Sequence, residues 1–407
     1  MSRTLVLVTE SYPYGGITES VFAAPDVRAL AAEWDCVIIA PLLRRGKIED
    51  SLPANVEVCD HIVNNPFWKH KWLRIFKALS PRVLSALSNR KPLASMKYAL
   101  AALTVRDCLS SLISDKGLKR GNTLLMSYWF SYETSAMMWL GLPYISRAHG
   151  YDLSLKKAGK LRTKTLANSL GIWAASKAGA ARLQETIADP SHKIRVAPLG
   201  SQNADKSKSA HHKASDRSVT FLSCARVVDI KRVSLSLDFM EALADARPDW
   251  TFEWIHIGDG DRMPELKLRV AESRRRNLSI ELKGAIGNSE VHELYRTRTI
   301  DWFLLLSTYE GGLPISICEA LSYGVPVVAT DTGGIPEAVD DSCGILMPAD
   351  ANPDEFVLSI IPYLDSDYRY GALSAGAFSR WAEHLDSDTL RPAFARATSS
   401  LPLHHNL

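Results

Sequence analysis

The feature that most constrains the fold is the stretch over residues 307–341, STYEGGLPISICEALSYGVPVVATDTGGIPEAVDD. The apolar run 302–306 before it predicts a buried parallel strand, and the turn over 308–313 leads into a predicted helix over 314–323. A second strand is predicted over 325–329, followed by a glycine turn and a helix that a proline can begin. Ligands of open α/β sheets bind beyond the carboxyl ends of the strands, so we expect a binding site at these turns.

Two glutamates lie in this stretch, Glu310 in the first turn and Glu319 in the helix after it. Glu319 is surrounded in sequence by apolar residues, and a buried charge requires a partner or a ligand. The neighbouring hydroxyls of a ribose would serve, because an ionised carboxylate accepts hydrogen bonds on both oxygens. The alternative is that Glu319 faces solvent on an amphipathic helix.

The stretch resembles the signature of retaining glycosyltransferases of the GT-B fold, in the large nucleotide-sugar-dependent family 4 (glycosyl transferases group 1). The matching motifs, in order, are Ser307-x-x-Glu310-Gly311, Glu319-Ala320, Gly324-x-Pro326-Val-Val-Ala-Thr330 and Gly333-Gly334-x-Pro336-Glu337. One departure is that eight residues separate the two glutamates where the family has seven, as though one glycine had been inserted. Glycine can take φ > 0 and absorb an extra residue in a turn.

The resemblance implies an α/β protein of two Rossmann-like domains facing across a cleft. It implies a retaining glycosyltransferase that moves a hexose from a nucleotide-diphosphate sugar to a glycan or lipid-linked acceptor by front-face attack, in polysaccharide or glycolipid biosynthesis. We expect UDP in preference to GDP as the nucleotide, and no cofactor. The alternatives are a nucleotide-sugar epimerase of the same fold and a non-catalytic binding protein.

The resemblance also assigns the donor site. Arg226 and Lys231, in the loop after a predicted strand over 219–224, match the family's Arg-x4-Lys and are expected on the diphosphate. Two fixed cations would stabilise the charge that grows on this leaving group, so no metal is expected. The residues assigned to the rest of the donor are Glu319 (ribose), Ile286 (base), and Glu310, Gly311, Gly312 and Leu313 (sugar ring).

The first part of the chain predicts a βαβ unit, with strands over 4–9 and 36–40, a helix over 18–33, and a glycine turn at Gly15-Gly16. Backbone N–H groups at a helix N-terminus favour phosphate, although a bare Gly-Gly is more often only a tight turn. The resemblance implies that Gly16 faces the donor phosphates and the acceptor.

His149 follows a predicted strand over 144–148 and precedes a glycine. A lone histidine is usually structural, but the resemblance implies a catalytic contact with the donor sugar. Asp152, three residues later, is expected to pair with Arg147 or to touch the acceptor.

No acidic residue occurs between Asp60 and Asp107, and the segment 66–97 interleaves lysine and arginine with aromatic residues. This pattern predicts contact with an anionic membrane surface or a lipid-linked acceptor. The alternative is a helical insertion with a solvated basic face. A nucleic-acid partner is not expected, because the net charge of the whole chain is only +3.

The length of 407 residues and the hydrophobic content of 46% predict a globular protein of two domains. We expect an acceptor-side domain over 1–200, a polar linker or exposed loop over 201–218, a nucleotide-sugar domain over 219–371, and a helix over 372–407 that crosses back. The six cysteines lack metal-ligand spacing, and no stretch reads as a signal peptide or a membrane span. These features predict a cytoplasmic protein, peripheral on the inner face of the cell membrane where the basic segment contacts it.

Overall fold

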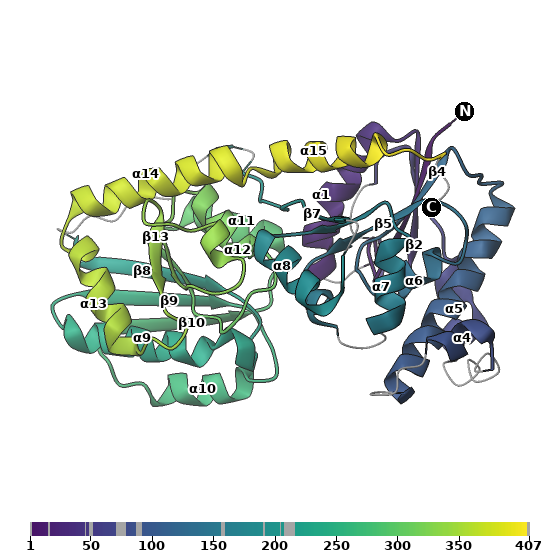
Figure 1. Cartoon of the computed structure of the whole chain (residues 1–407). Helices are drawn as coiled ribbons and strands as arrows, with labels where there is room; N and C mark the ends of the chain where they lie inside the picture. Colours follow the sequence, from purple (N-terminus) through teal and green to yellow (C-terminus); the bar gives the residue numbers. More distant parts are fainter. Residues whose placement is uncertain are drawn as a thin grey trace. The chain divides into compact units, whose positions relative to one another are not determined.

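The computed structural model describes residues 2–14, 17–44, 46–48, 52–70, 79–86, 92–155, 159–189, 192–203, 205–206 and 216–404. The chain divides into two compact units. Unit 1 is Met1–Pro198 with Thr389–Leu407, and unit 2 is Leu199–Asp388. In each unit, helices lie on both faces of a sheet (Figure 1) in which every strand pair is parallel.

Unit 1 is built on a sheet with the strand order β3-β2-β1-β4-β5-β6-β7. Its strands are β1 Thr4–Thr9, β2 Cys36–Pro41, β3 Val56–Val58, β4 Thr123–Ser127, β5 Tyr144–Ala148, β6 Gly171–Ala174 and β7 Ile194–Val196. Its helices are α1 Ile17–Glu33, α2 His61–Asn64, α3 Pro66–Lys69, α4 Pro81–Ser85, α5 Pro92–Asp115, α6 Tyr132–Met137, the 3-10 helix η2 Tyr151–Ser154, α7 Gly159–Ala167, α8 Lys177–Thr186 and α15 Ser387–Ser399.

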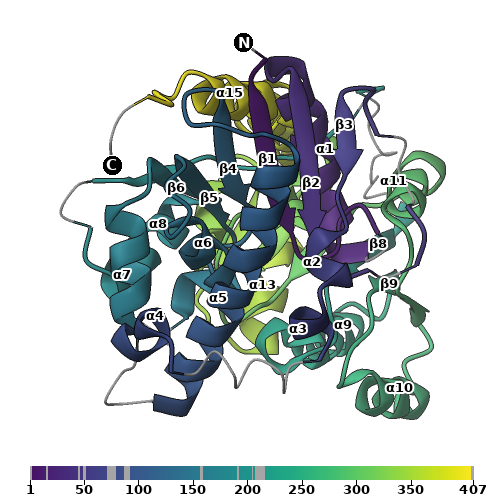
Figure 2. The same cartoon turned by 90° about the vertical axis from the view of Figure 1, so that its right-hand side faces the viewer.

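Alternate residues of β1 face the two sides of this sheet, as the pleat of a strand requires. Leu5 and Leu7 pack with α1 and with Phe394 of α15, whereas Val6 and Val8 pack with α5 and α6. Figure 2 shows α2, α5 and α6 over the second of these faces. Because both faces are covered, β1 is apolar at every position between its threonines.

Unit 2 is built on a sheet with the strand order β10-β9-β8-β11-β12-β13. Its strands are β8 Ser218–Cys224, β9 Thr251–Ile257, β10 Leu278–Gly284, β11 Trp302–Leu305, β12 Val327–Thr330 and β13 Gly344–Met347. Its helices are η4 Asp229–Lys231, α9 Val233–Ala246, α10 Met263–Glu272, α11 Asn288–Thr297, α12 Ile315–Ser322, η5 Ile335–Glu337, α13 Pro353–Leu364 and α14 Asp367–His384.

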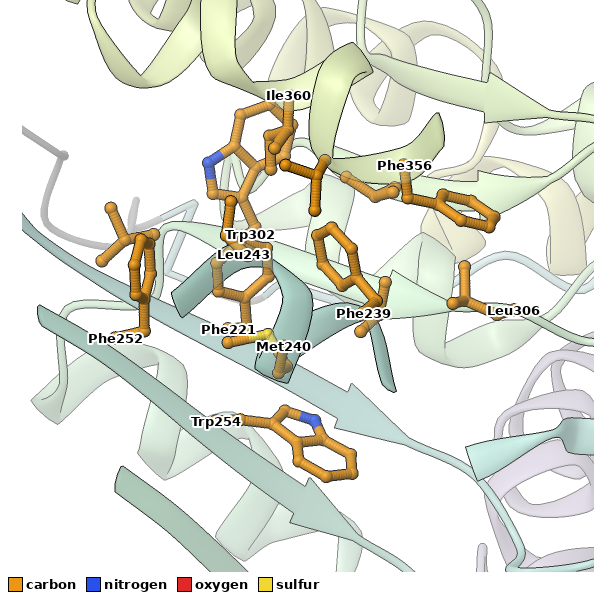
Figure 3. Close-up of a cluster of buried hydrophobic side chains, with 14 of the residues drawn as sticks. Phe221, Phe239, Met240, Leu243, Phe252, Trp254, Trp302, Leu306, Phe356 and Ile360 are labelled. Carbon is orange, nitrogen blue, oxygen red and sulfur yellow. The ribbon is translucent and has the colours of Figure 1, made fainter. Parts of the chain in front are cut away.

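The core of unit 2 also has two faces. Phe221 and Trp302 point to the face covered by α9 and α13, where they pack near Phe239 and Phe356 (Figure 3). Their neighbours in sequence, Leu222 and Phe303, point to the other face and pack with α12 and α14. The two clusters thus cover both faces of the sheet.

The predicted strands are present within a few residues of their expected ends, but three other segments differ from expectation. The helix expected at Pro336 is only the short 3-10 helix η5. The chain turns again soon after it, where Ser342 N–H donates to Asp340 Oδ1 at 3.0 Å. In the expected linker 201–218, Ser201 and Asn203 are buried.

The expected single helix over 372–407 is instead two helices, α14 and α15. Ser201 lies at the break between them, where its N–H donates to the Leu385 carbonyl at 3.0 Å and its carbonyl accepts from Ser387 N–H at 3.1 Å. The chain therefore leaves unit 2 at this break and ends in unit 1.

Candidate functional site

In unit 2 the loops after β8 and β11 lie side by side at the point where the strand order reverses. From β8 the chain proceeds outward to β9 and β10, whereas β11 lies on the other side of β8 and continues to β12. Thr308 N–H donates to the Ile230 carbonyl at 2.8 Å and so joins the two loops. Doubly wound sheets bind their ligands at such a reversal. The structure thus brings two predicted parts of the donor site together.

An ion pair and a hydrogen bond connect these loops through one carboxylate. Lys231 Nζ contacts Glu310 Oε1, although the two residues are 79 positions apart in sequence. Ser307 Oγ donates to the same carboxylate oxygen at 2.6 Å. Glu310 is buried, whereas the Lys231 side chain is partly exposed. The lysine charge is therefore held at the surface of the site, where an anionic group can reach it.

Two glycines let the turn after β12 approach the Glu310 turn. A Cβ on Gly333 would lie 1.7 Å from the Glu310 carbonyl oxygen, and one on Gly334 would lie 2.4 Å from that of Gly312. Gly333 also has a left-handed backbone with φ +56°. Gly334 N–H donates to the Glu310 carbonyl at 3.0 Å. The two glycine turns of the stretch 307–341 are thus packed against each other.

Glu319 lies on α12 and is buried, with 4% of its surface exposed, so the solvent-facing alternative is wrong. Asn288 Nδ2 donates to Glu319 Oε1 at 2.6 Å, and His292 Nε2 lies 3.9 Å from the same oxygen. Burial raises the pKa of Glu319 to about 7, and the Asn288 hydrogen bond offsets this only in part. Its protonation can therefore change near neutral pH when a ligand binds.

The other predicted donor contacts differ in exposure. Arg226 is exposed, and its side chain makes no hydrogen bond or ion pair with any residue that the structure describes. Gly311 and Gly312 are partly exposed. The side chains of Ile286 and Leu313 pack in the core around α12, so only the backbone of the buried Leu313 can face a ligand.

In unit 1 the strand order reverses between β1 and β4, and a buried glutamate joins the loops after these strands. Glu19 accepts three consecutive backbone N–H groups, those of Glu10, Ser11 and Tyr12, at 2.8, 2.6 and 2.9 Å. It also accepts from Trp129 Nε1 at 2.9 Å. The loop that leads toward the glycine pair is thereby fixed by α1.

His149 follows β5 and is almost fully buried among aromatic rings, 4.8 Å from Tyr128 and 4.9 Å from Trp129 between ring centroids. Burial and, to a smaller extent, the nearby Arg147 charge lower its pKa to about 3. Neither ring nitrogen has a hydrogen bond of normal geometry to any described residue. This buried, neutral imidazole therefore has unused hydrogen-bonding capacity on both nitrogens.

The expected pairing of Asp152 with Arg147 is wrong. Asp152 instead accepts hydrogen bonds from the backbone N–H groups of Phe130, His149 and Gly150, which shape the loop around the histidine. The carboxylate is fully buried and is satisfied by these donors. It therefore orients His149 and leaves no charge to offer an acceptor.

Arg147 instead forms a buried ion pair with Asp26 of α1, with Nε 2.9 Å from Oδ2. Arg391 of α15 pairs with the other oxygen at 2.7 Å, and Tyr128 donates to Asp26 at 3.0 Å. Burial alone would raise the pKa of Asp26, but the two arginines together hold it below its usual value. This cluster is close enough to His149 to affect its pKa, and it ties α1, β5 and α15 together.

Two sets of predicted contacts lie wholly or partly outside the described residues. Gly16 is one of them. The basic segment 66–97 is described only over 66–70, 79–86 and 92–97. Across the described ranges we find no helix that is both long enough and apolar enough to span a bilayer.

Three residues of these sites were not predicted from sequence. Asn288, which donates to Glu319, begins α11 and is 31 positions from its partner. Glu19 carried a weak signal, as an acidic residue in the first turn of a helix after a glycine pair. Glu133 on α6 is buried, and nothing in its local sequence marks it.

Comparison with known proteins agrees with this geometry. Residues 218–366 match the family model described as Glycosyl transferases group 1. The lipopolysaccharide core biosynthesis mannosyltransferase LpsB of Rhizobium meliloti is 28% identical over 204 residues, which is 48% of this chain and 56% of LpsB. The chain spans about half the length of the curated relatives it matches.

Solved structures resemble the whole chain. The Anabaena protein Alr3699/HepE, in complex with UDP and glucose, has a TM-score of 0.67 at 15% identity and covers 97% of this chain and 99% of its own. WaaG, a glycosyltransferase involved in lipopolysaccharide biosynthesis, has a TM-score of 0.64 at 14% identity, and the match covers 98% of this chain and 100% of WaaG. The predicted resemblance is confirmed: unit 2 carries a glycosyl transferases group 1 domain, in a chain of two Rossmann-like units with the GT-B fold.

Proposed function

We propose that the chain is a retaining glycosyltransferase that moves a hexose from a nucleotide-diphosphate sugar to a glycan or lipid-linked acceptor in polysaccharide or lipopolysaccharide biosynthesis. The family domain and the names of the relatives, among them a lipopolysaccharide core mannosyltransferase, support the activity and its setting. The UDP and glucose complex of the Anabaena protein supports UDP as the nucleotide.

One observation carries the proposal: Lys231, Glu310 and Ser307 meet at the strand-order reversal of unit 2. Lys231, together with the exposed Arg226, would hold the diphosphate, because fixed cations stabilise charge on a leaving phosphate. The Glu310 turn would then lie at the sugar ring. The buried Glu319 would accept hydrogen bonds from the ribose hydroxyls, and these bonds would offset the free-energy cost of burying its carboxylate.

The proposed reaction needs no covalent intermediate. The acceptor oxygen forms a bond to the anomeric carbon while the bond from that carbon to the phosphate oxygen breaks, and its electron pair leaves with the diphosphate. Both events occur on one face of the sugar, so the configuration is retained. The departing phosphate oxygen takes the acceptor proton, and Lys231 and Arg226 stabilise the charge in place of a metal.

The acceptor would bind unit 1 near His149, whose neutral, buried imidazole makes no hydrogen bond through either nitrogen to the described residues. The basic and aromatic segment 66–97 would place the enzyme at the inner face of an anionic membrane, where lipid-linked acceptors occur. The donor site of unit 2 is the first to test, because the residues assigned to it in that unit are all described.

Thermal unfolding with UDP, GDP, ADP and NAD tests the donor site. A nucleotide at about 100 times its Kd should raise the Tm of unit 2 by roughly 5–10 °C. One diphosphate nucleotide should raise the Tm of the wild type, and this rise should vanish in Glu319→Ala. The rise should persist in the control Glu272→Ala, which removes an exposed glutamate of α10. A response to NAD alone, or equal responses in both variants, would contradict the proposal. The anomeric configuration of the product, read by NMR, tests retention.

A further inference from the structure

Unit 1 contains a pocket of about 950 Å³ that the donor site does not explain. It opens at the carboxyl ends of the strands, since Glu10 follows β1, Leu42 follows β2 and Trp129 follows β4. Helices α3, α5 and α6 supply the remaining walls. Its size suits a small organic ligand, and its position is that of a binding site in a parallel α/β sheet.

Aromatic side chains form two of the pocket walls. Trp129 and Tyr151 lie 5.2 Å apart between ring centroids, and Trp68 and Tyr132 lie 5.8 Å apart. Tyr151 is 58% exposed although it belongs to an otherwise buried loop. Flat rings with polar tips suit ligands that combine apolar faces with hydroxyl edges, as sugar rings do.

A single buried acid faces the same pocket. Glu133 is 2% exposed, and its Oε2 has no hydrogen-bond partner among the described residues. Burial raises the pKa of this carboxyl well above its usual range, which favours its protonated form. A protonated carboxyl donates through O–H and accepts at its other oxygen, which matches a pair of sugar hydroxyls.

Cations surround the opening. Arg44, Lys69 and Lys97 line the pocket and are exposed. Arg44 has an ion pair with Asp60 at 3.6 Å, but neither Lys69 nor Lys97 has an acidic partner within the described part of the chain. The lining holds these three cations against two carboxylates, Glu10 and Glu133, and the pKa of Glu133 is raised by burial. The charge balance of the pocket is positive, so an anionic ligand is favoured.

We propose that this pocket is the acceptor subsite and that the acceptor is an anionic saccharide. Its terminal ring would lie on Trp129 and Tyr151, with hydroxyls on Glu133, and its phosphate at Lys69, Lys97 and Arg44. The inference rests on the proposed glycosyl transfer and adds the charge and placement of the acceptor. The phosphate can belong to a soluble saccharide or to a lipid-linked one, and the test separates the two.

Binding to the full chain without nucleotide is the test, measured by tryptophan fluorescence and isothermal titration. The probes are a hexose 1-phosphate, the uncharged methyl hexoside, and the same hexose on a short-chain prenyl diphosphate. We expect the phosphate to bind roughly tenfold more tightly than the methyl hexoside, and this preference to fall about tenfold in Lys97→Gln. Tighter binding of the prenyl diphosphate would assign a lipid-linked source, and equal binding a soluble one.

Matched variants separate the pocket from general effects of charge. Lys119→Gln removes an exposed lysine before the amino end of β4, the opposite edge of the sheet, and should leave binding unchanged. Glu133→Gln supplies both a donor and an acceptor and should bind both probes, whereas Glu133→Leu should weaken the binding of both. Equal loss in Lys97→Gln and Lys119→Gln, or no preference for the phosphate, would overturn the inference.

The outcome is distinguishable from failure of the proposed function. Nucleotide binding belongs to unit 2 and is read by the UDP response of Glu319→Ala. Loss of phosphate preference with an intact UDP response would overturn the acceptor subsite alone. A saccharide response without any nucleotide response would overturn the donor site instead.

Discussion

Replacement of Glu319 by glutamine should remove a pH-dependent loss of stability from unit 2. Burial raises the pKa of this carboxyl from 4.5 to about 7 in the folded protein. Below about pH 4.5 both folded and unfolded states hold the proton, and the stabilisation is fully present. As pH rises toward 7 the unfolded state loses its proton first, so stability falls until the folded state ionises as well.

The magnitude follows from the size of the shift. A change from 4.5 to about 7 corresponds to about 3 kcal/mol over the whole titration, of which about 2 kcal/mol falls between pH 5 and pH 7. For a unit the size of unit 2 this is a change of roughly 4–8 °C in Tm. Glutamine cannot ionise and can still accept from Asn288, so it should lack this change.

The assay is thermal unfolding of wild type and Glu319→Gln at half-unit steps from pH 5 to pH 8. Wild type should be more stable relative to the variant at pH 5 than at pH 7, and the difference should then level off. Glu272→Gln, on the exposed face of α10, corrects for the loss of one carboxylate from the same unit. A difference between wild type and Glu319→Gln that is constant with pH would refute the burial argument.

Three further outcomes test other contacts. Lys231→Ala should lower kcat by about 10²–10³ with little change in Tm. Lys267→Ala, at an exposed position of α10, should leave turnover unchanged. Near-normal turnover in Lys231→Ala would contradict the role assigned to Lys231. Gly333→Ala should lower Tm more than Gly284→Ala, because both have positive φ but only Gly333 meets a carbonyl; equal shifts would speak against the packing of the two turns. Arg391→Met should destabilise unit 1 by about 3 kcal/mol, since Asp26 loses one of its two arginines. Adding Asp26→Asn should restore part of the lost stability. If it restores none, the unpaired charge of Asp26 is not the cause of the loss.

The fold was largely predictable from local patterns. The apolar run at Trp302 has no polar alternation, and this is diagnostic of a strand covered on both faces, which the two clusters of unit 2 confirm. The motif spacing placed Lys231 and Glu310 in separate loops, and the parallel sheet explains why these loops meet.

The parts that were missed depend on partners distant in sequence. Asp152 had two plausible partners, and the three backbone N–H groups that satisfy it become neighbours only when the loop around His149 folds. Glu133 lines a pocket whose other residues come from segments distant in sequence, so its local sequence carried no sign of a pocket. Whether Glu319 faced the core also required the position of α11, since α12 alone allowed either.

The buried pairing of Asp26 with Arg391 makes unit 1 discontinuous along the chain. On the ribosome, Asp26 emerges long before Arg391, and the whole of unit 2 is made in between. Unit 2 is contiguous and can fold as soon as it has been synthesised. Until then Asp26 can pair with Arg147 but lacks Arg391. Unit 1 can therefore be completed only after unit 2 has been synthesised, when α15 supplies Arg391 to the pair with Asp26.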